Sequence, residues 1–151
     1  MIKLSANQTL IRPAVANDCS QLASLTEELG YPATLEQTAE RLNQICERVH
    51  DQVIFVVEIE QKIAGFIHVG LRTTLATPRS AEIYELVVTN ACRSRGLGGL
   101  LLAQAEAWGR SLNCQRMLVR SRIDREDAHR FYKTAGYTTQ KTQEVFGKEL
   151  R

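Results

Sequence analysis

The fold of this chain is decided by residues 82–102, EIYELVVTNACRSRGLGGLLL. The pattern predicts an apolar strand, a short polar loop, a basic glycine-rich turn and the start of an amphipathic helix. Free backbone N–H groups at a helix N-terminus bind anions, and the guanidinium groups of Arg93 and Arg95 suit phosphate oxygens. The stretch therefore predicts a site for a phosphorylated ligand, with a diphosphate as the natural guest.

Two familiar phosphate motifs do not fit this turn. A Walker loop would need G-x-x-x-x-G-K-[ST], which is absent, and a dinucleotide fingerprint would need a third glycine and an earlier position in the fold. The spacing Arg93-x-x-Gly96-x-Gly98 has a plainer interpretation as well, a tight strand-to-helix turn with solvated arginines. The turn alone does not decide between the two.

Composition indicates one globular domain, which we expect to span residues 1–151. Of the 151 residues, 44% are hydrophobic and 24% charged, and the net charge of +2 is too small to favour nucleic acid or a membrane surface as partner. The cysteines, Cys19, Cys46, Cys92 and Cys114, form no C-x-x-C pair, so we expect no metal site. With no signal peptide apparent, they are interpreted as reduced thiols of a cytoplasmic protein.

The order of elements predicts a mixed α/β domain. Helices are expected from Asp18 to Gly30, behind the capping box Thr34–Gln37, from Leu97 onward, and up to Gly136. Strands are expected at Thr9–Arg12, Val53–Ile59, Ile63–Leu71, Glu82–Val88 and Met117–Val119, with two closing strands at Tyr137–Thr142 and Glu144–Leu150.

Two motifs together resemble a known family. The R-x-x-G-x-G turn after an apolar strand resembles motif A of the GNAT family, the acetyl-CoA-dependent N-acetyltransferases. The later segment Asp127–Tyr137, DAHRFYKTAGY, resembles that family's A-x-x-F-Y-x-x-x-G-[FY] segment. The order of elements is similar too, so the resemblance covers nearly the whole chain.

The resemblance implies a GNAT fold and its reaction. In such a fold a central, mostly antiparallel sheet of six to seven strands is splayed between its fourth and fifth strands and flanked by about four helices. The implied activity is transfer of an acetyl group from acetyl-CoA to a primary amine of a small molecule, peptide or protein, by direct attack in a ternary complex. The alternative is a GNAT-like domain that binds acetyl-CoA as a sensor without turnover. A homodimer is compatible with the family, no metal is implied, and the acceptor amine and the acyl length stay open.

The resemblance also implies which residues bind the cosubstrate. The pantetheine arm would pair with Leu86, Val87 and Val88, and the diphosphate would lie on the turn and first helical residues, Arg93, Ser94, Arg95, Gly96, Leu97, Gly98, Gly99 and Leu100. Further contacts would come from Asp124, Ala128, Phe131 and Lys133. Many relatives carry an asparagine before the last helix, and this chain has none there, so Asp124 or Arg122 is expected to substitute for it.

The reaction needs a base and an acid. Glu82 and Glu85 are the candidates for the base, although simple alternation places them on opposite faces unless a bulge intervenes, and a water relay is a third option. Tyr132 resembles the family's general acid. Tyr31 is expected to wall the acceptor pocket and Glu85 to hold the ammonium group. His129 is interpreted as a histidine that packs or hydrogen-bonds locally. His68 could face the acceptor cleft, but a hydrogen-bonded histidine within the sheet is the favoured interpretation.

Overall fold

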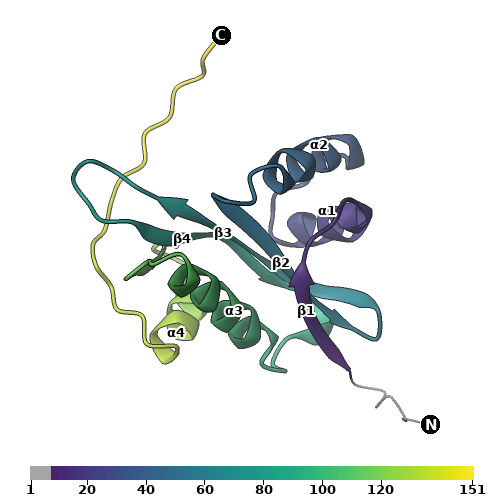
Figure 1. Cartoon of the computed structure of the whole chain (residues 1–151). Helices are drawn as coiled ribbons and strands as arrows, with labels where there is room; N and C mark the ends of the chain where they lie inside the picture. The colour runs from purple at the N-terminus through teal and green to yellow at the C-terminus, as the bar shows by residue number, and fades with distance from the viewer. Residues whose placement is uncertain (1–7) are drawn as a thin grey trace. The chain divides into compact units, whose positions relative to one another are not determined.

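Five strands lie side by side in sequence order in the computed structural model, which describes residues 8–151 (Figure 1). Neighbours are antiparallel up to β4, and β4 and β5 are parallel. The predicted mixed α/β class with a mostly antiparallel sheet is therefore confirmed. The strands are β1 (Thr9–Pro13), β2 (Gln52–Ile59), β3 (Lys62–Arg72), β4 (Ser80–Val88) and β5 (Met117–Val119).

The chain divides into two units. The first, Met1–Val119, contains the sheet with α1 (Cys19–Glu28), α2 (Leu35–Cys46) and α3 (Leu97–Ser111), and two short 3-10 turns, η1 (Ala16–Asp18) and η2 (Asn90–Cys92). The second, Arg120–Arg151, contains α4 (Glu126–Thr134).

Local sequence signals set the ends of the first two helices as expected. Thr34 accepts a hydrogen bond from the backbone N–H of Gln37, and the side chain of Gln37 accepts one from the backbone N–H of Thr34, which closes the predicted capping box at α2. Helix α1 ends at Glu28, and Gly30 follows with φ of +100°. The helix pair therefore occupies the place that the sequence pattern predicts.

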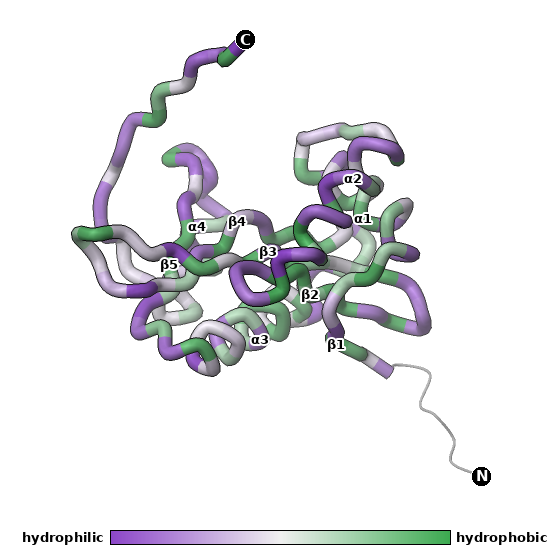
Figure 2. The backbone as a smooth tube through the Cα atoms, turned by 45° about the horizontal axis from the view of Figure 1, so that its top comes forward, coloured by the Kyte–Doolittle hydropathy of each residue, from purple (hydrophilic) through white to green (hydrophobic). Residues whose placement is uncertain are grey.

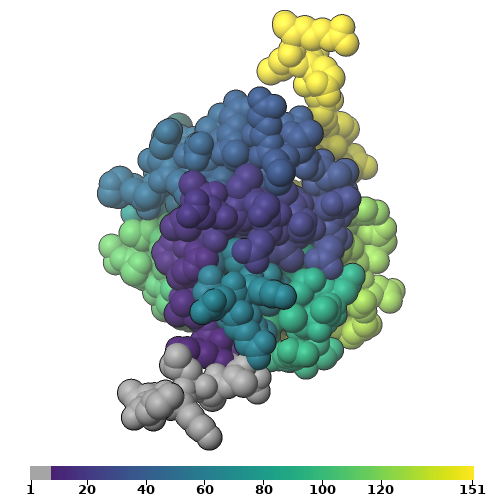
Figure 3. All heavy atoms as spheres, turned by 90° about the vertical axis from the view of Figure 1, so that its right-hand side faces the viewer, coloured from purple at the N-terminus to yellow at the C-terminus, as the bar shows by residue number. Residues whose placement is uncertain are grey.

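The sheet of the first unit is covered on both faces. In Figure 1, α1 and α2 lie on one side of the sheet and α3 on the other, and Figure 3 shows the outer surface formed by β1, α1 and α2. Apolar residues of α1 and α2, among them Leu22, Leu25 and Leu42, pack with Ile54, Val56 and Phe66 of the sheet. Figure 2 shows green, hydrophobic stretches of the tube within the strands between the layers. The helix pair α1 and α2 does not extend over the end of the sheet where β4 and β5 lie.

A partly buried ion cluster joins β1 to η1 and β2. The guanidinium of Arg12 donates to both carboxylate oxygens of Asp18, each at 2.8 Å, and to Glu58 at 2.7 Å. Asp18, at 4% exposure, also accepts from the backbone N–H of Val15 at 2.8 Å. The hydrogen bonds from Arg12, followed by that of Val15, hold the pKa of Asp18 below its usual range despite burial.

Replacing Asp18 with Asn should destabilise the first unit by about 2–3 kcal/mol at neutral pH, because Arg12 loses its bidentate partner. A carboxyl whose pKa is depressed on folding stabilises the protein above its unfolded pKa, and that contribution is lost as pH falls through the folded pKa. In urea melts of both proteins from pH 7 down to about pH 2, the difference in stability should stay constant above about pH 5. It should then narrow progressively below about pH 4, where an unfolded Asp titrates, and close only below the lower folded pKa of Asp18. A constant gap across that range would contradict this account.

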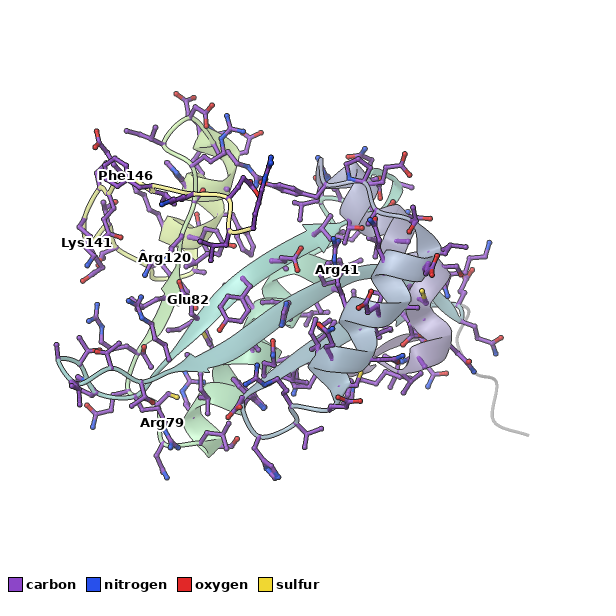
Figure 4. All side chains as sticks on the ribbon, turned by 90° about the horizontal axis from the view of Figure 1, so that it is seen from above. Arg41, Arg79, Glu82, Arg120, Lys141 and Phe146 are labelled. Carbon is purple, nitrogen blue, oxygen red and sulfur yellow. The ribbon has the colours of Figure 1, made fainter. Side chains whose placement is uncertain are left out.

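The second unit differs from the sequence-based prediction after α4. The helix ends near Gly136 as predicted, with φ of +96° at that glycine. The two predicted closing strands, Tyr137–Thr142 and Glu144–Leu150, do not form, so the sheet has five strands among the described residues rather than six to seven. Figure 4 labels Lys141 and Phe146 on this segment, where Val145, Phe146 and Leu150 are 92%, 87% and 89% exposed. The local β propensity of Thr, Val and Phe does not make a strand without a pairing partner.

Candidate active site

A β-bulge places the two candidate base residues on the same face of the sheet. Glu85 pairs with His68 and Ile83 pairs with Val69, so Tyr84 is an extra residue of β4 without a partner on β3. Glu82 pairs with Gly70, two residues from His68 on the same face. Simple alternation would have separated Glu82 from Glu85, and the bulge that the sequence left open brings them together about 7 Å apart along the strand.

Five side chains form what we call the polar patch, on the face that α1 and α2 cover farther along: Gln52, His68, Glu82, Tyr84 and Glu85. His68 and Glu82 are each 8% exposed, whereas the side chain of Glu85 is 36% exposed. Glu82, labelled in Figure 4, lies on β4. The patch therefore contains a buried carboxylate and a reachable one.

Hydrogen bonds and ring packing order this patch. Nε2 of His68 lies 2.7 Å from Oε1 of Gln52, and its Nδ1 lies 3.4 Å from Oε1 of Glu85. The ring of Tyr84 meets the ring of His68 edge to face, with centroids 4.9 Å apart. Position 70 must be glycine for this arrangement, because a Cβ there would lie 2.5 Å from the Tyr84 hydroxyl. Burial and then the charge of Glu82 raise the pKa of Tyr84.

The far end of β4 has an edge that β5 does not cover. Parallel pairing with β5 joins Ala81, Glu82 and Ile83 to Met117, Leu118 and Val119, and it stops there. Leu86, Val87 and Val88 pair with β3 on one side only among the described residues. Except for the carbonyl of Val88, which accepts from Arg93, backbone groups along the other edge of this segment can pair with an extended, amide-bearing ligand.

This edge leads into a turn with the features of an anion site. Ser94 and Gly96 have φ of +65° and +77°, and Gly96 is the N-cap of α3, where it has no side chain to cap the N–H groups that follow. Arg93 and Arg95 are exposed beside the turn, and Nε of Arg93 donates to the carbonyl of Val88 at 3.3 Å. The remaining predicted diphosphate residues lie on or directly after this turn: Ser94, Leu97, Gly98, Gly99 and Leu100.

Other predicted site residues lie on α4 or just before it, in the second unit. Tyr132 is half-buried, and its ring lies 5.1 Å from that of Phe131 and 5.6 Å from that of Tyr137. Burial raises the pKa of Tyr132, with a smaller opposing effect of Arg125, so the phenol keeps its proton at neutral pH. Asp124 forms an ion pair with Arg122 at 2.8 Å. Ala128 and Phe131 are half-buried and Lys133 is exposed.

Sequence reasoning missed part of the polar patch. Gln52 was not singled out, and for His68 a hydrogen-bonded sheet histidine was preferred to a residue facing the acceptor cleft. Their positions indicate a shared site only when the register of β2, β3 and β4 is known. In that register Gln52 pairs with Gly70, and His68 pairs with Glu85. Tyr31, predicted to wall the acceptor pocket, is 66% exposed between α1 and α2.

Residues 8–151 lack the side-chain clustering of a metal centre. No group of three or more His, Cys, Asp or Glu side chains could hold a metal ion there. Within the same range, no helix is both long and apolar enough to span a bilayer. All four cysteines are free thiols.

A bulged strand with a free edge, followed by an uncapped helix with a basic turn, suits a ligand that combines an amide-bearing arm with a diphosphate. The model of the acetyltransferase (GNAT) family matches residues 18–137. The chain therefore belongs to the GNAT family, an acyltransferase family of N-acetyltransferases.

Individual relatives agree with the family assignment. An uncharacterized N-acetyltransferase of Bacillus subtilis is 29% identical over 108 residues, which cover 72% of this chain and 75% of that protein. A glucosamine-6-phosphate N-acetyltransferase from Arabidopsis thaliana shares the fold, with a TM-score of 0.81, 21% identity, and coverage of 94% and 99% of the two chains. An aminoglycoside N-acetyltransferase in complex with CoA has a TM-score of 0.85 at 13% identity, covering 99% of this chain and 100% of that one.

Proposed function

We propose that this protein transfers an acetyl group from acetyl-CoA to a primary amine of a small molecule or an exposed peptide or protein amine, by direct attack in a ternary complex. The observation that carries the proposal is the continuity of the free β4 edge at Leu86–Val88 with the uncapped N-terminus of α3. An amide-rich arm matches the first feature and a diphosphate the second. The CoA complex of the structural neighbour supports the same ligand.

The chemistry assigns distinct roles to the residues. An alkylammonium group titrates near about 10.4 and must lose a proton before it can attack. We propose Glu82 or Glu85 as the carboxylate that promotes this loss and a β4 amide near Leu86 or Val87 as donor to the oxyanion. Tyr132 is our candidate for the acid that protonates the departing sulfur, and its raised pKa supports a protonated phenol.

The further CoA contacts on Asp124, Ala128, Phe131 and Lys133 belong to the same proposal, as does the acceptor wall at Tyr31. We also propose that both units belong to one N-acetyltransferase domain, because the family match at residues 18–137 includes parts of each. Four free thiols favour a reducing, cytoplasmic location.

The test is a turnover assay on the full chain. The protein is mixed with acetyl-CoA and a panel of amines: alkylamines, diamines, amino sugars, aminoalkylphosphonates and lysine peptides. The phosphonates are included because a Salmonella typhimurium aminoalkylphosphonate N-acetyltransferase is 43% identical over 56 residues, 37% of this chain. We expect free thiol release and an acetylated product with at least one amine. Tight acetyl-CoA binding without any product would instead indicate a sensor, and no binding at all would overturn the cosubstrate.

A further inference from the structure

We propose that Gln52, His68 and Glu85 form a proton relay in which Glu85 is the base and His68 is the positioning residue that takes the proton from it. This inference rests on the proposed acetyl transfer and specifies which of the two glutamates acts. The relay joins three strands, since Gln52 lies on β2, His68 on β3 and Glu85 on β4.

Gln52 determines which ring nitrogen of His68 carries the hydrogen. With the amide placed so that its oxygen lies 2.7 Å from Nε2, that oxygen can only accept, and Nε2–H of His68 must donate. In the neutral imidazole the other nitrogen then has a lone pair and is the basic atom. That atom, Nδ1, is the one that faces Oε1 of Glu85.

The distance between His68 and Glu85 is longer than a charge-assisted hydrogen bond, as expected when no proton lies between the two groups. A charge-assisted N–H···O bond is about 2.7–2.9 Å long, whereas Nδ1 and Oε1 are 3.4 Å apart. His68 is held by Gln52 and by the ring of Tyr84, while the side chain of Glu85 is 36% exposed and can shorten this contact. A proton that arrives on the carboxylate would therefore be shared with Nδ1.

Exposure selects Glu85 over Glu82 as the base. Glu82 is 8% exposed, so an amine approaching from solvent meets Glu85 first. Glu85 also directly precedes Leu86, where the free β4 edge continues. Among the described residues, the charged and titratable groups on this side of the sheet include Glu85, Glu82 and the phenol of Tyr84 from β4. Arg72 of β3 also acts on Tyr84, where its charge opposes the rise in pKa, and Gln52 on β2 is neutral.

Acetyl transfer through the relay conserves protons and electron pairs. One N–H bond of the acceptor ammonium breaks, its electron pair stays on nitrogen, and the proton passes to Glu85 and then to Nδ1 of His68. The nitrogen pair forms the C–N bond to the acetyl carbon, the C–S bond breaks, and its electron pair leaves on sulfur. The sulfur gains the amine's second proton, and the relay returns the first one to water.

The experiment uses the full chain, acetyl-CoA, an amine that the panel shows to be accepted, and an analogue of similar size that carries enough β-fluorines for its ammonium pKa to lie below the assay pH. His68→Gln keeps a polar side chain but has no basic atom. We expect its kcat with the basic amine to fall about 10²-fold, the lower end of the range for a general base, with little change in the KM for acetyl-CoA. With the fluorinated amine the loss should shrink to about threefold or less, since that amine is largely neutral already.

Matched variants separate the relay from a loss of structure. His50→Gln changes an exposed histidine in the turn before β2 and should behave as wild type. In a Glu85→Gln background, adding His68→Gln should cause no further loss, because the relay is already broken. Gln52→Leu, at a half-buried position, should show the same dependence on amine basicity if His68→Gln melts below the assay temperature.

Two outcomes overturn the relay while leaving acetyl transfer intact. One is an equal loss with both amines. The other is a double variant whose losses multiply. If the wild-type protein acetylates no amine in the panel, the proposed acetyl transfer itself is wrong, and the relay that rests on it is wrong as well.

Discussion

Tyr132→Phe is expected to lower kcat about 10²-fold while the melting temperature changes little. The phenol would supply the proton that the departing thiolate takes, and phenylalanine keeps the ring without the proton. Burial raises the pKa of Tyr132, so the wild-type group stays protonated throughout the neutral range. Steady-state kinetics with 4-carbon to 6-carbon alkylamines or the best amine of the panel would measure the loss.

A matched control for this variant is Tyr137→Phe, the neighbouring tyrosine whose ring lies 5.6 Å from that of Tyr132. The family-like segment takes either Phe or Tyr at this position, so kcat should stay within about twofold of wild type, as for a substitution outside the chemistry. If both variants lose activity equally, the effect comes from the packing of the three rings rather than from proton donation. If Tyr132→Phe is fully active, Tyr132 is not the acid.

The sequence predicted those features that depend on neighbours along the chain. The capping box at Thr34 and Gln37 forms because both partners lie within one helical turn. The start of α3 after Gly96 follows from a left-handed residue directly before a leucine-rich helix. Such features need no knowledge of the partner strands, which is why residues 82–102 could be interpreted first.

Features that depend on partners far away in the sequence could not be predicted from local sequence patterns. The bulge at Tyr84 is a property of how β4 pairs with β3, and it decides that Glu82 and Glu85 share a face. The polar patch unites Gln52 with His68 and Glu85, residues 16 and 17 positions apart from His68 in the chain. The predicted closing strands failed for the same reason, since local β propensity was counted where no pairing partner exists among the described strands.

The role of the basic turn can be tested by adding a charge where the diphosphate should bind. Gly99 is the third residue of α3, and a Cβ built there meets nothing within 4 Å, so a side chain fits without strain. Asp in the first turn of a helix favours the fold, because the carboxylate interacts well with the helix dipole. Gly99→Asp should therefore melt at or slightly above the wild-type temperature.

Binding of acetyl-CoA should respond in the opposite direction. A carboxylate about 4 Å from a phosphate costs roughly 4 kcal/mol per pair of unit charges at an effective dielectric constant near 20, and less where water screens it. We therefore expect Gly99→Asp to raise the Kd of acetyl-CoA roughly 100-fold, measured by calorimetry, and part of the loss to recover in 0.5–1 M salt, where the Debye length falls toward about 3 Å. Gly99→Asn has the same shape without the charge and should stay within about fivefold of wild type, as expected when no charge is added. Equal losses of acetyl-CoA affinity for the Asp and Asn variants would mean that the size of the side chain blocks the site. Unchanged binding in both variants would mean that the diphosphate does not bind at the N-terminus of α3.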